Sequence, residues 1–435
     1  MLRIQEACEN DLRLIYEMQV EAFQQLLDKY HDHDTSPAAE PFERTLQRFN
    51  YDNVVYHLIM LDDSPIGAAR VRWQDTTYAL VQLLIKPEYQ NKGYAQQAMR
   101  EIERLYPNAK KWVLDTIAQE EKLCYLYEKM GYHKTGQTER VNERMDMVFY
   151  EKENALEKAF YKSELKHYGI ASEGARLIRE QNGVIVARVC YGGKTAVLKC
   201  FEKPEFRREI VNYGILQSCG VPTIAVLANS ERSILLEDIG ASPVYRLGEE
   251  RDLNDPAVVK AIARWYKTLH TRGVAYVQKH GESMYEEWDE FTLENILAVR
   301  ERFALSDCEG LKLIIESFDE LRRRMDVAPR TLAYNDFYYT NMVVKKDLSE
   351  ALMFDYNLLG KGCPASDIHN VTYWFSDKNK ELFFLEYGEI DEELMRLDSI
   401  AAPIVTLISA MKRDIFPEWA KEAKNELNGV ADLMR

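Results

Sequence analysis

The sequence lacks the features that mark membrane-spanning, secreted and nucleic-acid-binding proteins. No apolar run approaches the roughly 20 residues that a membrane helix needs, and the charged first residues contain no signal-peptide core. The seven cysteines form no C-x-x-C pair, and their odd number fits no closed disulfide framework, so we expect reduced thiols in a cytoplasmic protein. Bases are also scarce: 56 lysines and arginines face 71 acids, which leaves no basic footprint for nucleic acid.

Length and composition place the chain among globular proteins with more than one domain. Its 435 residues exceed one ordinary core, with 46% apolar and 29% charged residues. The net charge of −15 is compatible with a cationic small-molecule partner, because acidic clefts concentrate cations, although solubility explains the charge more simply. We expect no nucleic-acid or membrane partner, and nothing in the sequence indicates an oligomeric state.

The first 152 residues predict an α/β domain. Hydrophobic periodicity predicts strands and helices in this order: a strand at the start, a helix at about 11–30, strands at 54–63, 65–73 and 78–85, a helix at about 93–106, a strand at 111–117, a helix at 120–130 and a strand near 144–151. Residues 153–168 are charged and strongly helix-forming, so they predict a helical linker.

A second domain is predicted from residue 169 to residue 435. Short strand patterns fill about 169–240, and mostly helical patterns fill about 241–435. Strands first and helices later favour a small β-rich lobe on a larger helical lobe.

A strand-to-helix turn in the first domain has the properties of a phosphate-binding site. The apolar strand that ends at Ile85 is followed by the polar turn Gln90-Asn91-Lys92-Gly93-Tyr94-Ala95, after which a helix is predicted. A helix that begins at such a turn presents free backbone N–H groups and the positive end of its dipole. Gly93 lets the backbone approach a phosphate closely, and the small Ala95 leaves room for it.

This turn resembles the [RQ]-x-x-G-x-[GA] pyrophosphate loop of the GNAT acetyltransferases, and Leu126-Tyr127-Glu128-Lys129-Met130-Gly131-Tyr132 is similar to their L-Y-E-K-x-G-F box. The resemblance implies a GNAT fold, a mixed sheet with flanking helices, that acetylates an amine with acetyl-CoA bound along residues 90–95. It further implies that backbone N–H groups near Leu84 and Ile85 hold the thioester carbonyl. Tyr127 would be the general acid toward the leaving sulfur.

Three features of this site stay open. The family often has Asn and Ala seven and four residues before the tyrosine, where this chain has Glu120 and Leu123, so a contact to CoA is missing. Three acids lie near strand ends on the side where the acceptor is expected, and each is a candidate general base: Glu88, Asp75 and Asp115. Their spacing does not choose among them. The segment that contains His31 and His33 favours a solvated loop over a metal site, because no third ligand is suitably spaced.

Two acids and an amide in the second domain form a pattern suited to phosphoryl transfer. Asp336 and Asn341 are five residues apart between two apolar strands, and Asp355 ends another strand. This chemistry needs one carboxylate to orient and deprotonate a hydroxyl, and oxygen ligands for Mg²⁺. Each of these residues alone is typical of a turn beside a hairpin. The three together indicate a phosphoryl-transfer site.

The pattern resembles H-G-D-x-x-x-x-N…(I/F)-D of the aminoglycoside phosphotransferases, which are related to choline kinases and protein kinases. The resemblance implies a bilobal kinase-like fold that uses ATP (or GTP) and Mg²⁺. The implied roles are as follows: Asp336 as catalytic base, Asn341 and Asp355 as metal ligands, Asp367 as the helix anchor, Lys199 in Ala196-Val197-Leu198-Lys199 as the phosphate-binding lysine, Glu209 (or else Glu205) as its partner, and Glu237 and Ile239 in the hinge beside the base.

Three positions depart from that family. Tyr334-Asn335 replaces His-Gly before the catalytic Asp, Asn357 stands where a second acid is usual, and Glu180–Gly183 contains a single glycine where a glycine-rich loop would lie. All the charged residues that carry the chemistry remain, which favours an active kinase over a nucleotide-sensing pseudokinase.

The sequence therefore predicts a bifunctional enzyme that acetylates an amine and phosphorylates a hydroxyl, with an aminoglycoside or aminosugar as a candidate acceptor. Two alternatives stay open: an active acetyltransferase with a pseudokinase regulatory domain, and two enzymes on different metabolites that are merely tethered. The acidic stretches 285–290 and 389–393 are candidates for a polycation-binding wall, with solvated helix faces as the simpler interpretation.

Overall fold

The structure is a computed structural model that describes residues 2–412, 416–417 and 420–434. The chain divides into two compact units, Met1–Asn182 and Gly183–Arg435. Because residues 169–182 group with the first unit, the division falls later than the domain start at 169 that the sequence suggested.

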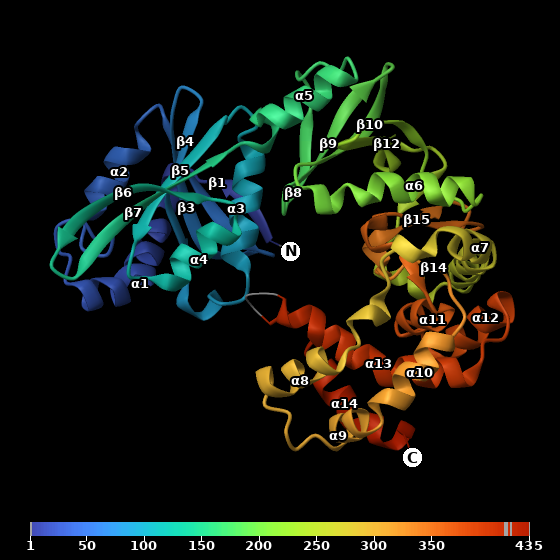
Figure 1. Ribbon diagram of the computed structural model, residues 1–435. Coiled ribbons are helices and arrows are strands. Elements are labelled where there is room, and N and C mark those ends of the chain that lie inside the picture. The colour runs from blue at the N-terminus through green and yellow to red at the C-terminus, as the bar shows by residue number, and fades with distance from the viewer. Residues whose placement is uncertain (1, 413–415, 418–419, 435) are drawn as a thin grey trace. The chain divides into compact units, whose positions relative to one another are not determined.

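The first unit is built on a seven-stranded mixed sheet (Figure 1). Its strands lie in the order β1-β2-β3-β4-β5-β7-β6, and β4 and β5 are parallel while the other neighbours are antiparallel. The strands are β1 (Leu2–Glu6), β2 (Val54–Leu61), β3 (Ser64–Gln74), β4 (Thr77–Ile85), β5 (Lys111–Ile117), β6 (His133–Asn142) and β7 (Met145–Glu153). This arrangement confirms the predicted mixed sheet with flanking helices.

Helices cover both faces of this sheet because its strands alternate two apolar faces. In β2, Leu58 is buried in the cluster that holds Ile15 of α1, whereas its neighbour Ile59 joins Ala98 of α3 in another cluster. The helices of this unit are α1 (Leu12–Tyr30), α2 (Phe42–Phe49), α3 (Tyr94–Leu105), α4 (Glu121–Lys129) and α5 (Ala159–His167), and the short strand β8 (Arg176–Gln181) follows.

Two elements of this unit differ from the sequence-based expectation. The strand β6 was not predicted, because its mostly exposed polar residues show no hydrophobic alternation, and its pairing with β7 defines it instead. The expected linker helix over 153–168 is wrong in its first part. Glu153 belongs to β7 and pairs with Lys111, and only 159–167 are α-helical, so sheet pairing overrides helix propensity there.

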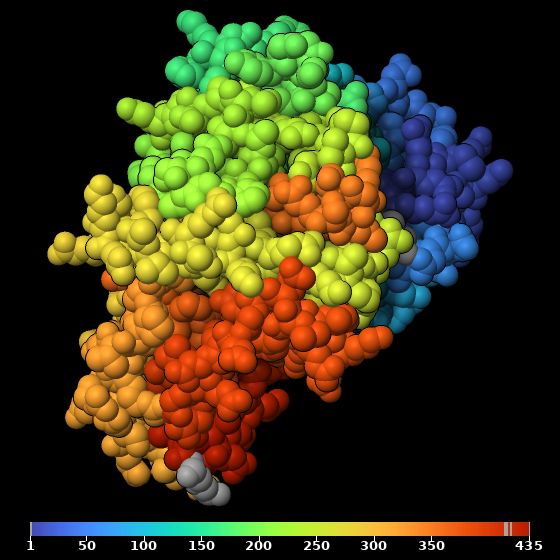
Figure 2. All heavy atoms as spheres, turned by 90° about the vertical axis from the view of Figure 1, so that its right-hand side faces the viewer, coloured from blue at the N-terminus to red at the C-terminus, as the bar shows by residue number. Residues whose placement is uncertain are grey.

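The second unit begins with a small β-rich lobe. The antiparallel strands β9, β10 and β12 lie side by side, with β11 next to β12. The elements of this lobe are β9 (Val184–Tyr191), β10 (Lys194–Phe201), α6 (Arg208–Ser218), β11 (Val226–Asn229) and β12 (Ser233–Glu237). Figure 2 shows these segments in green, beside the orange and red segments of the helical lobe.

The larger lobe is mostly helical, as predicted. Its helices are α7 (Pro256–His280), α8 (Leu293–Arg302), α9 (Glu309–Glu316), α10 (Phe318–Val327), α11 (Pro364–Thr372), α12 (Asp377–Tyr387), α13 (Glu392–Met411) and α14 (Ala423–Met434). Its short strands are β13 (Tyr245–Leu247), β14 (Thr331–Ala333), β15 (Met342–Lys345), β16 (Ala351–Met353) and β17 (Gly360–Gly362). By length and composition α13 could cross a membrane, but 56% of its most apolar window is buried, and it packs against α8, α11 and α14.

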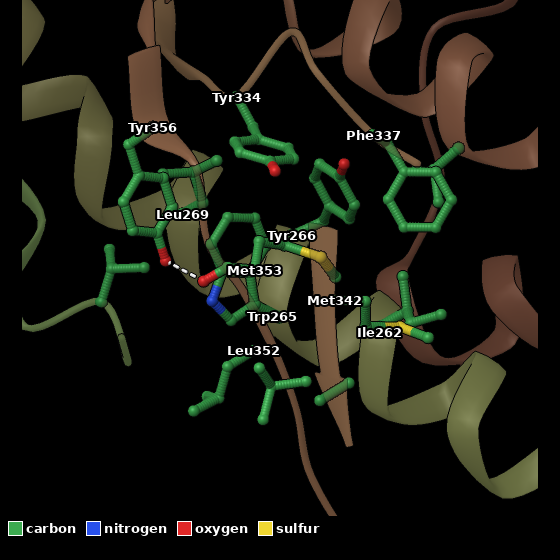
Figure 3. Packing of buried hydrophobic residues seen from close by; sticks show 14 of the residues in the cluster. Ile262, Trp265, Tyr266, Leu269, Tyr334, Phe337, Met342, Leu352, Met353 and Tyr356 are labelled. Atoms are coloured by element: carbon green, nitrogen blue, oxygen red, sulfur yellow. Dashed lines mark hydrogen bonds between the residues drawn. The ribbon is translucent and has the colours of Figure 1, made fainter. Parts of the chain in front are cut away.

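The core of the second unit is rich in aromatic rings. Trp265 of α7, Tyr334 and Tyr356 pack edge to face around the two loops that carry the predicted acids (Figure 3). Tyr213 of α6 extends this packing, with its ring centroid 4.7 Å from that of Tyr356. The loops are therefore anchored in this core, and their acids Asp336 and Asp355 are half-buried.

Candidate functional site

The turn before α3 has the geometry of an anion cradle. Asn91 and Gly93 adopt left-handed conformations with φ values of 59° and 81°, and α3 begins directly after Gly93. A Cβ atom at Gly93 would meet nothing within 4 Å, so the backbone here is open. Gln90 anchors the turn by donating from Nε2 to the carbonyl oxygen of Ile85 at 2.8 Å, and Lys92 donates from Nζ to that of Glu88 at 2.8 Å.

The strands next to this cradle separate and leave a wedge. β4 and β5 pair only through residues Thr77–Ala79 and Lys111–Val113. Beyond them, a bulge shifts the register between β3 and β4, so that Arg70 faces Gln82 while Val71 faces Leu80. The open halves of β4 and β5 end beside the N-terminus of α3, which is the arrangement that an extended thioester arm needs.

Only alternate backbone amides of β4 face this wedge. Lys86 donates its N–H to the carbonyl oxygen of Ile66 on the β3 side at 2.9 Å. Because successive amides of a strand point to opposite sides, the N–H of Ile85 faces the wedge and that of Leu84 faces β3. The expected contact to the thioester carbonyl therefore fits Ile85, and Leu84 contributes its side chain to the core.

Tyr127 lies on α4, beside the wedge, with its ring against those of Tyr132 and Tyr150. Burial raises the pKa of its phenol well above the usual value, and the charge of Asp115 adds to this effect. The phenol is thus held protonated, as a general acid requires. Glu120, at the departure from the family pattern, receives hydrogen bonds from Lys29 at 2.6 Å and Tyr30 at 2.7 Å, so it ties α1 to the start of α4.

The structure separates the three candidate bases. Asp115 lies on the half of β5 that pairs with β7 but not with β4. Desolvation by the surrounding protein raises the pKa of its carboxyl, the charge of Glu139 raises it further, and Arg72 lowers it. Asp75 lies in the turn between β3 and β4, at the paired end of the wedge. Glu88 lies in a short 3₁₀ turn after β4 and is exposed. Position and a raised pKa both favour Asp115.

In the second unit, Lys199 joins two acids from distant parts of the chain. Its Nζ lies 2.6 Å from Glu209 Oε2 on α6 and 2.9 Å from Asp355 Oδ1 after β16. All three groups are largely buried, and although burial lowers the pKa of Lys199, the two carboxylates raise it above the usual value. Glu205 lies in a separate 3₁₀ turn and is exposed, so Glu209 is the ion-pair partner.

Asp336 and Asn341 contact each other close to Asp355. Asn341 donates from Nδ2 to Asp336 Oδ2 at 3.2 Å, and its carbonyl oxygen accepts the N–H of Phe354 at 3.0 Å. Burial and the charge of Asp355 raise the pKa of Asp336 to about 7, although Lys199 lowers it. A carboxyl with this pKa can accept a proton near neutral pH.

Asp367, which the resemblance implied to be a helix anchor, lies on α11 and holds the loop that carries Asp336. It accepts the backbone N–H groups of Tyr334 at 2.7 Å and Asn335 at 2.8 Å, and His270 of α7 lies 3.0 Å from its Oδ2. Asp367 is 1% exposed, so these contacts replace water completely. His270 was not predicted from the sequence, because it is a lone histidine in an otherwise apolar helical pattern.

The Tyr334-Asn335 departure preserves the loop. Asn335 has φ 61°, the left-handed conformation that glycine allows and that asparagine tolerates best among the other residues. Its Nδ2 donates to the carbonyl oxygen of Leu358 at 3.1 Å, and Tyr334 donates its hydroxyl to that of Phe354 at 2.5 Å. Both replacements thus tie the catalytic loop to the segment around Asp355.

The hinge region contains an ion pair that the sequence did not predict. Arg188 of β9 donates from Nε and Nη2 to Asp238 at 2.6 and 3.1 Å. Glu237 continues β12, with its N–H bonded to the carbonyl oxygen of Ala225 at 3.0 Å, and the Ile239 side chain is buried in the core. Only the backbone of Ile239 is therefore available to a nucleotide base.

The side chains that could bind a metal in this chain suit magnesium better than a metal ion held by protein ligands alone. Among the described residues, no group of three or more His, Cys, Asp and Glu side chains could hold a metal ion, which includes His31 and His33. Asp355 and Asn341 offer a carboxylate and an amide oxygen on adjacent backbone segments. Magnesium is typically held by one or two such groups together with substrate phosphates, so these two residues fit it.

Part of the first unit matches a known protein family. Residues 13–132 match the model of the acetyltransferase (GNAT) family. Comparison with curated proteins gives no match. Among solved structures, the chain is similar to a spermidine N-acetyltransferase from Vibrio cholerae in complex with CoA and spermine, with 19% identity and a TM-score of 0.30 over 35% of this chain and 95% of that chain.

The chain is also similar to two kinases. An ethanolamine kinase from Plasmodium vivax shares 15% identity, with a TM-score of 0.46 over 72% of this chain and 94% of that chain. A macrolide 2′-phosphotransferase from Brachybacterium faecium shares 13% identity, with a TM-score of 0.44 over 63% and 96%. Residues 13–132 of the first unit therefore match the GNAT family model, and the second unit joins a small β-rich lobe to a larger helical lobe.

Proposed function

We propose that the chain is a bifunctional group transferase that acetylates an amine in its first unit and phosphorylates a hydroxyl in its second. The observation that supports acetyl transfer is the wedge between β4 and β5 beside the open N-terminus of α3. The observation that supports phosphoryl transfer is the convergence of Lys199, Glu209 and Asp355 next to Asp336.

In the acetyltransferase site, acetyl-CoA is the donor substrate and its pyrophosphate binds the amides at the start of α3. The N–H of Ile85 faces the wedge and stabilises negative charge on the thioester oxygen as the amine attacks. Asp115 takes a proton from the acceptor's ammonium group, so that the neutral amine attacks the thioester, and the protonated Tyr127 donates a proton to the departing thiolate.

In the kinase site, ATP (or GTP) is the phosphoryl donor, and magnesium when bound supplies charge neutralisation between its phosphates. Lys199 holds the phosphates and is fixed by Glu209 on α6. Asp355 and Asn341 would hold the metal, and Asp336 orients the acceptor hydroxyl and removes its proton. Backbone groups near Glu237 and Ile239 contact the base.

The acceptor is proposed to be a small organic cation, in a cytoplasmic setting without nucleic-acid or membrane partners. Glu287 supports this choice, because burial, together with Asp398 and Asp367, raises its pKa to about 8 in the acidic segment before α8. A cation placed there would favour the charged carboxylate and relieve its repulsion from the neighbouring acids.

The test is to incubate the full chain with labelled acetyl-CoA, γ-labelled ATP and a panel of polyamines, ethanolamine, choline and aminosugar antibiotics. Transfer of acetyl to an amine and of phosphate to a hydroxyl is expected. Asp336→Ala should abolish only the phosphate transfer, and Asp115→Asn should impair only the acetyl transfer. If ATP binds without turnover on any acceptor, the second unit is a nucleotide-sensing regulator and the bifunctional assignment fails.

A further inference from the structure

A cavity of about 710 Å³ lies between α6 and the C-terminal end of α7, away from the groups assigned to catalysis. Its α6 wall is formed by Arg208, Val211, Asn212 and Ile215, whose spacing places them on one face of the helix. Glu209 is not part of this wall, and neither Asp336 nor Asn341 lines the cavity. We call it the α6 cavity.

Basic side chains outnumber acidic ones in the lining of the α6 cavity, whereas acids outnumber bases in the chain as a whole. Its lining contains the bases Arg208, Lys279 and His280 and the single acid Glu282, in a chain where acids outnumber bases by 71 to 56. Within the described residues, neither Lys279 nor His280 has a side-chain hydrogen bond or ion pair with the protein. Bases at a helix C-terminus also compensate its dipole, which accounts for Lys279 and His280, but Arg208 comes from the other helix.

Arg208 is held in place facing this cavity. Its Nε donates to Asn357 Oδ1 at 3.2 Å, and its guanidinium lies 5.5 Å from the ring centre of Tyr285. Among the described residues, Arg208 forms no ion pair with a carboxylate, and its guanidinium is fixed instead by a neutral amide and an aromatic ring. It is therefore preorganised for an anion.

The rest of the lining is apolar and partly open to water. Val211 is 64% exposed, although it is a large aliphatic side chain on a helix, and Ile215, Met284 and Leu359 extend the apolar surface. Apolar surface inside a concave site favours a ligand that can cover it. The volume lies within the roughly 300–1,000 Å³ that small-molecule sites occupy.

We propose that the α6 cavity is a second ligand site, which takes a small anion with an apolar or aromatic body. The anionic group lies between Arg208 and Lys279, and the body covers Val211 and Met284. This binding follows from the charges and shape of the cavity and requires no catalytic activity.

The α6 cavity is also connected to both partners of Lys199. Arg208 precedes Glu209 on α6, and Asn212 donates from Nδ2 to the carbonyl oxygens of Tyr356 at 2.7 Å and Leu359 at 3.4 Å, in the segment after Asp355. A ligand that holds α6 therefore biases the position of both acids. Coupling between two sites is reciprocal, so the same ligand changes nucleotide affinity. This coupling rests on the proposed kinase function.

The binding experiment uses the full chain and three probes of one shape: naphthalene-2-sulfonate, the uncharged 2-naphthalenemethanol and the cationic 2-naphthylmethylammonium. Calorimetry should show binding of the sulfonate in preference to both others. Equal affinity for the cationic probe would overturn the proposal.

Variants at Val211 test the location of this binding, because this exposed position accepts either charge without disturbing the fold. Val211→Lys should tighten sulfonate binding and Val211→Glu should weaken it, each by about fivefold, as expected for one charge contact at a partly exposed site. Lys279→Gln should also weaken it. Lys378→Gln, an exposed and unpaired lysine on α12, is the matched control and should change nothing. Identical affinities for the two Val211 variants would place the probe elsewhere and sink the proposal.

The coupling is measured as the ATP dissociation constant with and without saturating sulfonate. A change of at least about twofold is expected in the unmodified chain, and in Val211→Glu the same change should require about fivefold more sulfonate. Sulfonate binding without any change in ATP affinity would refute the coupling while the site stands. Sulfonate binding in a chain that does not bind ATP at all would instead refute the kinase function.

Discussion

The two candidate sites of this chain are built in different ways. The site in the first unit, proposed for acetyl transfer, is made of backbone: a left-handed turn at Gly93, the free amides at the start of α3 and the separation of β4 from β5. The site in the second unit, proposed for phosphoryl transfer, is made of charges: Lys199 pairs with Glu209 and Asp355, and Asp367 holds a loop by its carboxylate. Backbone sites tolerate changes of side chain, whereas a buried charge network depends on every member.

The largest expected effect tests whether the two regions act independently. Asp336→Asn should lower phosphoryl transfer about 10³-fold, because the hydroxyl loses its proton acceptor. Acetyl transfer by the same protein should be unchanged. Parallel assays with labelled ATP and acetyl-CoA measure both, and a loss of acetyl transfer would show that the two regions are not separable.

The second test removes the anchor of the charge network. Asp367→Asn should lower the free energy of unfolding by about 3 kcal/mol, because a buried carboxylate with several hydrogen bonds becomes a neutral group. Phosphoryl transfer should fall about 100-fold as the loop loses its geometry. Denaturant unfolding gives the stability. Asp347→Asn, at an exposed turn, is the control and should change stability by less than about 0.5 kcal/mol.

The third test concerns the backbone site. Gly93→Ala should raise the KM for acetyl-CoA about tenfold, because a side chain at φ 81° costs about 1–2 kcal/mol and distorts the cradle. Gly136→Ala is a matched control: it has φ 84° and, like Gly93, nothing within 4 Å of an added Cβ, but it lies in β6. Both should lose similar stability, and only Gly93→Ala should change the KM. An equal change in both would mean that strain alone is measured.

A fourth test examines the residue that stands where the kinase family has glycine. Asn335→Ala should lower the free energy of unfolding by about 2 kcal/mol, since alanine tolerates φ 61° poorly and the bond to Leu358 is lost. Asn335→Gly removes only the side-chain hydrogen bonds to Leu358 and Ala333 and should cost about 1 kcal/mol. Thermal unfolding of both compares them. If alanine is as well tolerated as glycine, backbone conformation does not decide this position.

The smallest expected effect is a dependence of stability on pH. Burial raises the pKa of Asp336 to about 7 in the folded chain, well above the usual aspartate value. The folded state therefore binds this proton more tightly, and the stabilisation is complete at low pH and lost as pH rises through about 7. Asp336→Asn cannot ionise, so its melting temperature relative to the unmodified chain should be higher at pH 8 than at pH 5. The opposite order would contradict the raised pKa.

Much of both sites could be predicted from the sequence because their signals are local. Gln90, Gly93 and Ala95 lie within one turn, and Asp336 and Asn341 are five residues apart, so each set forms a short motif whose resemblance to a family pattern identified it. The edge strand β6 and the strand character of Glu153 could not be predicted in this way, because neighbouring strands provide their hydrogen bonds. The Arg188–Asp238 pair and the α6 cavity likewise gave no sequence signal.

The sequence by itself determined which chemistry each half can carry, because residue types and their local spacing decide which atoms are available. Only the tertiary structure decided how these atoms meet. It placed Asp115 on the half of β5 that does not pair with β4, turned the amide of Ile85 rather than that of Leu84 into the wedge, and gathered Tyr334, Asn335 and His270 around Asp367. The physical reason is distance along the chain. Lys199 and Asp355 are 156 residues apart, so packing of the two lobes, and no local pattern, brings them to 2.9 Å.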